Sequence, residues 1–158
     1  MSYRTGIGVD VHRLVRGRPM ILGGVTISSE RGIEGHSDGD VLSHSLVDAL
    51  LGAASSGDIG SHFPSSDPKY RDISSLVLLG HVLELIREQG YEIQNTDSTI
   101  IVQSPKLAPY ITAMKEKVAG ALGCDPDAVS VKATTTDYLG FLGTGEGIAA
   151  LSTVLITR

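Results

Sequence analysis

Hydrophobic positions near the N-terminus alternate with small or polar ones, which is the pattern of a β-strand. Ile7, Val9 and Val11 follow this period of two, and the pattern predicts a first strand that ends near His12. A second strand is predicted over residues 20–27, with an interruption where two glycines occur together.

The next clear pattern is the three- and four-residue spacing of an amphipathic helix. Residues 31–39 are rich in glycine and polar side chains and are predicted to form a loop, and the helix is predicted to begin near Asp40. Asp38 or Asp40 can cap its first amides, and Gly57 is a natural stop. The predicted apolar face consists of Leu42, Leu46, Ala49, Leu50 and Ala53.

The rest of the chain alternates between helical and strand patterns. Residues 58–72 contain two prolines and are predicted to form a loop. Helices are predicted over 73–89 and 107–122, and strands over 99–102, 129–136 and 147–157. This order predicts an α+β fold in which helices pack on one face of a mixed sheet of four to five strands. Residues 1–158 are expected to form a single domain.

Composition and charge exclude several classes of protein. The chain has 158 residues, of which 41% are hydrophobic, and its formal net charge is −5. Nucleic acid is not an expected partner, because proteins that bind its phosphates usually carry a basic surplus. No membrane partner is expected either, because no apolar run approaches the roughly 20 residues that span a bilayer. Cys124 is the single cysteine and residues 1–10 lack an apolar signal region, which predicts a cytoplasmic protein.

Three side chains suggest a metal centre. Asp10 and His12 are two residues apart on the first predicted strand, so they face the same side. His44 follows the predicted helix start by four residues. One carboxylate and two imidazoles suit Zn²⁺ and leave a fourth position open, as a catalytic site requires. The alternative is an ordinary surface pair, but the polar cluster at 36–40 favours the metal site over it.

Further polar side chains lie near this centre in the sequence. Asp40, His44 and Asp48 share one predicted helix face, so a carboxylate could orient the His44 ring, although a solvated polar stripe would look the same. His62 follows a loop aspartate and is a weaker candidate for contact with a substrate. His81 is predicted to be an ordinary helix residue.

A second group of residues suggests phosphate handling. Thr134, Thr135 and Thr136 stand at the end of a predicted strand, where their hydroxyls can donate to phosphate oxygens. Asp137 adds a hard oxygen ligand suited to Mg²⁺ or Mn²⁺. The alternative is that threonine is simply a good strand former. No phosphate-binding glycine motif of the common nucleotide folds occurs in the chain.

Together, motifs from about residue 6 to 156 resemble the 2-C-methyl-D-erythritol 2,4-cyclodiphosphate synthase family. The motifs are Asp10-Val11-His12, His36-Ser37-Asp38-Gly39-Asp40, His44, Asp58-Ile59-Gly60, Phe63-Pro64, Asp67-Pro68, Pro105-Lys106, Lys132-Ala133-Thr134-Thr135-Thr136 and Gly145-Glu146-Gly147. The resemblance implies conversion of 4-diphosphocytidyl-2-C-methyl-D-erythritol 2-phosphate to the cyclic diphosphate and CMP, in non-mevalonate isoprenoid synthesis. It also implies a homotrimer with active sites between neighbouring subunits.

The resemblance also assigns roles to matching positions. It implies that Zn²⁺, or a similar divalent metal, is bound by Asp10, His12 and His44, and that His36 and Thr135 stabilise the transition state. Asp137 would contact a Mg²⁺ or Mn²⁺ ion bound with the substrate diphosphate. The methylerythritol pocket would comprise Asp58, Ile59, Gly60, Phe63, Pro64, Ser65, Ser66 and Asp67. The cytidine and diphosphate pocket would comprise Val102, Gln103, Ser104, Pro105, Lys106, Leu107, Ala108 and Thr134, and the remaining substrate contacts would be Ser37, Thr136 and Phe141.

The implied chemistry needs no protein nucleophile, because the 2-phosphate of the substrate attacks the β-phosphorus and CMP leaves. Two other interpretations of the residues stay open. A zinc-dependent phosphoesterase would use the same three ligands and release phosphate. A non-catalytic interaction module would hold a structural metal with a fourth protein ligand.

Overall fold

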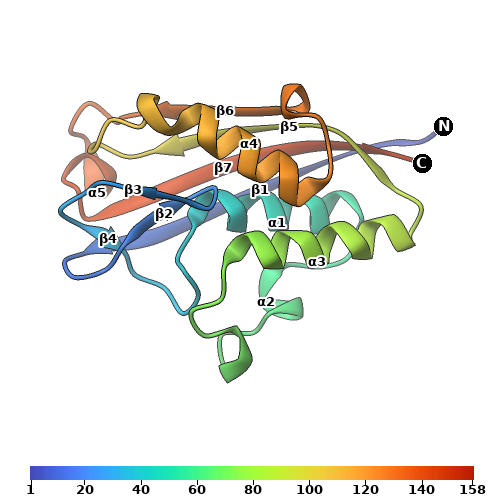
Figure 1. The fold of residues 1–158 in the computed structure, drawn as a ribbon, viewed down its shortest axis with the longest axis horizontal. Coiled ribbons are helices and arrows are strands. Elements are labelled where there is room, and N and C mark those ends of the chain that lie inside the picture. Colours follow the sequence, from blue (N-terminus) through green and yellow to red (C-terminus); the bar gives the residue numbers. More distant parts are fainter.

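A mixed five-stranded sheet forms the centre of the protein in the computed structural model, which describes residues 1–158 (Figure 1). Its order is β4 (Gly32–Ile33), β1 (Tyr3–Val15), β7 (Gly147–Thr157), β5 (Glu92–Ile101) and β6 (Val129–Thr134). β5 and β6 are parallel, and the other neighbours are antiparallel. A separate two-stranded sheet joins β2 (Met20–Leu22) to β3 (Val25–Ile27). The predicted mixed sheet is therefore confirmed.

Helices cover one face of this sheet, as predicted (Figure 1). The long helices are α1 (Val41–Ala53), α3 (Ser75–Glu88) and α4 (Ile111–Leu122), and the short ones are α2 (Ile59–His62) and α5 (Gly140–Gly143). Single 3₁₀ turns occur at Pro68–Tyr70, Ala108–Tyr110 and Pro126–Ala128. α1 packs on β1 and β7, α4 packs on β6, and α3 lies against both helices. None of these helices has the length and hydrophobicity that a membrane span requires.

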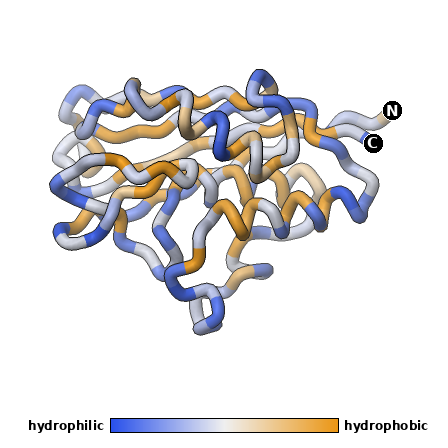
Figure 2. Tube along the Cα trace, viewed as in Figure 1, coloured by the Kyte–Doolittle hydropathy of each residue, from blue (hydrophilic) through white to orange (hydrophobic).

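The hydrophobic core lies between the sheet and the helices, where the apolar segments gather in Figure 2. α1 is buried around almost its whole circumference, because β1, β7 and α3 surround it. The predicted amphipathic helix with one polar face is therefore wrong in this respect. Val41, Val47 and Leu51, which lie outside the predicted apolar face, are fully buried.

The opposite face of β1 is apolar and exposed. Ile7, Val9 and Val11 have exposed fractions of 64%, 57% and 49%. The alternate residues of the strand, Gly8 and Asp10 among them, face α1. The alternation therefore predicts the strand correctly, while its apolar side points away from the core of this chain.

Several element boundaries differ from those predicted. The segment 20–27 forms a hairpin, because its two glycines adopt positive φ angles of 54° and 72°. The segments 31–39 and 58–72 contain the short strand β4, the helix α2 and a 3₁₀ turn. α1 ends at Ala53, before Gly57, because Ser55 already takes a positive φ of 55°.

Candidate metal centre

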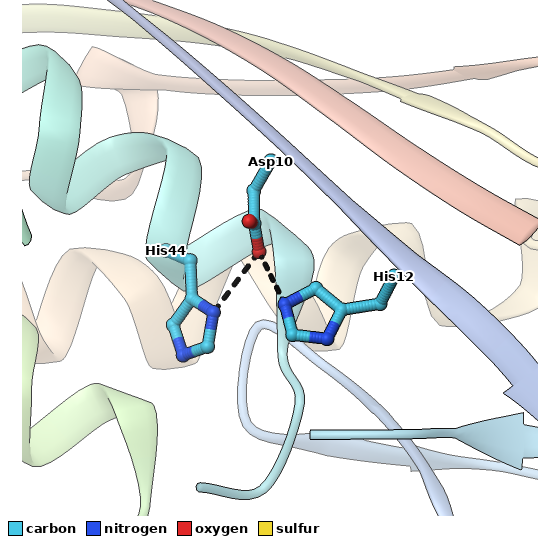
Figure 3. Close-up of side chains that lie close together, drawn as sticks. All are labelled: Asp10, His12 and His44. Atoms are coloured by element: carbon cyan, nitrogen blue, oxygen red, sulfur yellow. Dashed lines mark hydrogen bonds and ion pairs between the residues drawn. The ribbon is translucent and has the colours of Figure 1, made fainter. Parts of the chain in front are cut away.

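Asp10, His12 and His44 converge as the sequence predicts (Figure 3). Asp10 Oδ2 lies 2.8 Å from His12 Nε2 and 3.0 Å from His44 Nδ1. The three candidate ligand atoms all lie within 4.8 Å of one another. Two ligands come from β1 and one comes from α1, so the packing of this strand on this helix creates the centre.

The beginning of α1 is fixed by a buried carboxylate. Asp40 caps the helix by accepting a hydrogen bond from the backbone N–H of Ser43. Its two oxygens also accept hydrogen bonds from the N–H groups of Gly23 and Gly24, each at 2.9 Å. The first turn of α1, which carries His44, is thereby tied to the hairpin β2–β3. Burial and the nearby charge of Asp38 raise the pKa of Asp40.

The hydrogen bonding of His12 favours a bound cation. Its Nδ1 lies 2.5 Å from the carbonyl oxygen of Glu34, which can only accept. Nδ1 therefore carries the ring proton, and Nε2 of the neutral imidazole presents a lone pair to the Asp10 carboxylate. Two acceptors at this distance repel each other unless a second ring proton or a metal ion intervenes. The donor set and its orientation thus fit a divalent metal.

Charge coupling within the centre shifts two pKa values. Burial of Asp10 opposes its ionisation, but hydrogen bonds and charge interactions with His12 and His44 outweigh burial and lower its pKa to about 2. Burial likewise disfavours the charged form of His12, while its bond to Asp10 and the charge of that carboxylate raise the His12 pKa. The centre thus attracts positive charge strongly, whether from protons or from a metal ion.

The other predicted residues fall into two regions. His36 and Ser37 lie in the loop before α1, where His36 accepts a backbone hydrogen bond from Asp72. Asp58 caps α2, and the segment that follows carries Phe63, whose ring packs edge-on against Tyr70. The substrate residues expected in this region are Asp58, Ile59, Gly60, Phe63, Pro64, Ser65, Ser66 and Asp67. Residues 58–72 project from the body of the protein (Figure 1).

The second region surrounds a cavity of about 290 Å³ at the ends of β5 and β6. Its lining consists of Val102, Gln103, Pro105, Lys106, Leu107, Ala108, Ile111, Ala133, Thr134 and Thr135. Ser104 lines a neighbouring depression instead. None of the three metal-centre residues lines the cavity. A single chain therefore presents the metal centre and this cavity as separate features.

Comparison with known proteins identifies the relationship. A family model described as the YgbB family matches residues 3–157. The chain belongs to the YgbB family. It is 56% identical over 155 residues to the 2-C-methyl-D-erythritol 2,4-cyclodiphosphate synthase of Bacillus pumilus, covering 98% of each protein. It is 55% identical over 156 residues to the protein of the same name from Geobacillus kaustophilus, covering 99% of each.

Solved structures agree with this membership. The bifunctional IspDF of Campylobacter jejuni superimposes with a TM-score of 0.95 at 46% identity, and the match covers 98% of this chain and 42% of that longer protein. The CDP complex of IspF from Plasmodium falciparum gives a TM-score of 0.87 at 32% identity, covering 99% of this chain and 97% of that one. The fold of this YgbB-family chain is therefore that of solved synthase structures.

The environment of His44 in this YgbB-family chain corrects one expectation. Neither Asp40 nor Asp48 contacts the His44 ring, because Asp40 faces the hairpin and Asp48 accepts a hydrogen bond from the N–H of Ile59. His44 Nε2 instead lies 2.8 Å from Ser75 Oγ and 3.0 Å from Ser37 Oγ. No sequence spacing indicated Ser75, because it comes from α3, 31 residues away.

Proposed function

We propose that this chain converts 4-diphosphocytidyl-2-C-methyl-D-erythritol 2-phosphate to 2-C-methyl-D-erythritol 2,4-cyclodiphosphate and CMP. The observation that carries the proposal is the convergence of Asp10, His12 and His44, whose candidate ligand atoms lie within 4.8 Å of one another, in a chain whose relatives are named for this synthesis. The reaction makes the chain a phosphorus–oxygen lyase of isoprenoid biosynthesis. The single free cysteine is consistent with action in the cytoplasm.

Asp10, His12 and His44 would hold Zn²⁺ or a similar divalent ion. Such an ion supplies Lewis-acid stabilisation of phosphate charge. The substrate carries its own nucleophile, so the protein's task is to hold the 2-phosphate in line with the β-phosphorus and to neutralise charge. His36 stands in the loop that leads to Asp40 and would donate to a phosphate oxygen. The Thr135 hydroxyl would do the same from the other side of the diphosphate.

The two regions would meet only in an assembly. The cavity at 102–108 would receive the cytidine. The segment 58–67, which the bond from the Ile59 N–H to Asp48 joins to α1, would receive the methylerythritol. Because these features are separate on one chain, we propose a homotrimer in which neighbouring subunits complete each site. The exposed apolar face of β1, with Ile7, Val9 and Val11, supports such an interface.

A second metal belongs to this proposal. Asp137 is exposed in the turn that follows Thr136, so its carboxylate is free to contact a Mg²⁺ or Mn²⁺ ion that arrives with the diphosphate. Phe141 is also exposed, and Thr136 Oγ1 donates to the Leu139 carbonyl oxygen at 2.7 Å, which holds this turn together. These residues would complete the diphosphate end of the cytidine pocket.

The decisive experiment supplies the cytidine-linked substrate and measures CMP and inorganic phosphate separately. We expect CMP and the cyclic diphosphate from the wild type, and neither from His12→Ala, together with loss of bound zinc. His81→Ala is a matched control for zinc content, because this histidine is exposed on α3 and lies outside the metal centre. Release of phosphate without CMP would favour a phosphoesterase, and full turnover without metal would refute the assignment.

A further inference from the structure

The ring edge of His44 that faces away from the metal centre contacts Ser75, a residue that lies in none of the family motifs. Ser75 is the first residue of α3, and its side chain is fully buried. Its Oγ lies 2.8 Å from His44 Nε2, on the ring edge opposite the metal centre. The same hydroxyl donates to Asp38 Oδ1, and the Ser75 N–H donates to Asp38 Oδ2 at 2.9 Å. Both carboxylate oxygens of Asp38 therefore accept a hydrogen bond from Ser75.

We propose that Ser75, oriented by Asp38, is a positioning residue that makes His44 a ligand through Nδ1. This inference rests on the proposed function, since it concerns the metal centre of that reaction. Ser75 contacts Nε2 of His44, whereas Asp10 contacts Nδ1 of the same ring, so Ser75 acts on the metal centre through the ring of His44.

Counting protons gives the direction of each hydrogen bond. An ionised carboxylate only accepts, so the single hydroxyl proton of Ser75 points to Asp38. The Ser75 oxygen is then left as an acceptor towards His44, and Nε2 must carry the ring proton. The lone pair of the neutral ring consequently sits on Nδ1, the atom that lies 3.0 Å from Asp10 Oδ2. Asp38 thus determines the tautomer of His44 without contacting the ring, because it fixes the direction of the Ser75 hydroxyl proton.

The hydroxyl of Ser37 does not determine which nitrogen of His44 carries the proton. Its Oγ also lies near His44 Nε2, at 3.0 Å, but it makes no bond to a carboxylate. Its other contact comes from the Gly39 N–H at 3.4 Å, which leaves the hydroxyl proton free to rotate. Ser37 can therefore accept from the ring or donate to it, whereas Ser75 can only accept.

The series of hydrogen bonds from Asp38 through Ser75 to His44 also connects three segments of the structure. Asp38 belongs to the loop before α1, Ser75 to α3 and His44 to α1. The ring is therefore oriented by a contact between α1 and α3 in addition to its own backbone. Partners of this kind typically contribute 10- to 100-fold to metal affinity, roughly, because they fix the ring and increase its basicity.

The test is the zinc affinity of Ser75→Ala, measured by competition with a chromogenic chelator at fixed pH. We expect zinc to bind about 10- to 100-fold more weakly than in the wild type. Ser98→Ala is the matched control, because Ser98 is also buried and its hydroxyl bonds to Ser152 and not to His44. Thermal unfolding of both variants shows that each is folded. The Ser75 N–H remains bonded to Asp38 in the alanine variant, which favours folding.

A second measurement addresses the tautomer directly. Long-range ¹H–¹⁵N correlation of the zinc-loaded wild type should show the His44 proton on Nε2, and a proton on Nδ1 would overturn the inference. Wild-type zinc affinity in Ser75→Ala would overturn it as well, even if the wild type releases CMP. Conversely, weakened zinc binding in Ser75→Ala with no CMP release by the wild type would sustain the positioning role and reject the proposed reaction.

Discussion

Gly8 of β1 lies directly against the backbone of Ser45 in α1, and a Cβ atom on Gly8 would overlap the Ser45 carbonyl oxygen. Gly6, one strand period earlier, stands in the same relation to Ala49. These two glycines let the strand and the helix approach closely. Asp10 follows Gly8 by two residues on the same face of β1, and His44 immediately precedes Ser45 in α1. This close approach therefore brings the carboxylate within 3.0 Å of the imidazole.

The first prediction concerns this contact. Gly8→Ala should destabilise the protein by about 1–3 kcal/mol, because the added methyl group meets backbone that cannot rotate away. It should also weaken zinc binding by separating Asp10 from His44. Urea denaturation at one protein concentration and chelator competition measure the two effects.

Gly80→Ala is the control for this substitution. Gly80 lies in α3 and has no atom within 4 Å of an added Cβ, so alanine should stabilise the helix by roughly 0.5–1 kcal/mol. A Gly8→Ala protein as stable as the wild type would show that the strand can shift away from α1 at no cost.

The same strand shows where prediction from sequence succeeds and where it stops. The alternation of Ile7, Val9 and Val11 correctly predicts β1, yet the side buried against the helix is the one with glycines and metal ligands. A period of two defines two faces but does not say which is covered. Which face of β1 is buried in this chain depends on the close packing of its glycines against α1, and a strand pattern does not encode that contact.

The ligands of the metal centre could be predicted from the sequence, but the residues that hydrogen-bond to those ligands could not. Asp10 and His12 share a face by strand geometry, and His44 is predicted as the third ligand from its position near the start of the helix. Helix spacing suggested Asp48 as a partner for His44, but α1 is surrounded on all sides, so the partner comes from α3. Contacts between distant segments leave no periodic signal along the chain.

The second prediction is a pH dependence of the metal-free protein. The lowered pKa of Asp10, about 2, contributes stability above its unfolded pKa of roughly 4, which is lost as pH falls towards 2. The raised pKa of His12 contributes stability below its unfolded value of roughly 6.5, which is lost as pH rises through the folded value. Both contributions are complete only between these unfolded values.

Asp10→Asn tests this window. In the presence of a chelator, the wild type should exceed the variant in unfolding free energy by about 1–2 kcal/mol between pH ~4 and ~6.5, and by less at pH 9. Denaturation curves across the pH range give the comparison. A difference that stays constant from pH 4 to 9 would show that the carboxylate and imidazole are not coupled.

The third prediction concerns assembly. Val9→Glu places a charge in the centre of the exposed apolar face of β1, and an unpaired charge buried in an interface is costly. We expect the proposed trimer to dissociate into monomers. CMP release should then be lost, because in that assembly each active site needs residues from two neighbouring subunits. Sedimentation velocity measures the mass. Val77→Glu is the matched control, since Val77 is 46% exposed on α3 and should leave the mass unchanged.

The last prediction concerns the link between the cytidine cavity and the threonine-rich turn. Gln103 lines the cavity, and its side-chain oxygen accepts a hydrogen bond from the Tyr138 N–H at 3.0 Å. Asp137 and Tyr138 adopt positive φ angles of 52° and 64°, which are unfavourable for residues other than glycine, so the turn needs such a tie. Gln103→Ala removes a bond worth about 1 kcal/mol, so the KM for substrate should rise about fivefold.

Gln89→Ala, which removes a surface hydrogen bond to Ser56, should leave KM unchanged. An unchanged KM in Gln103→Ala would mean that the turn keeps its conformation without Gln103, through interactions such as the hydrogen bond from Thr136 Oγ1 to the Leu139 carbonyl oxygen.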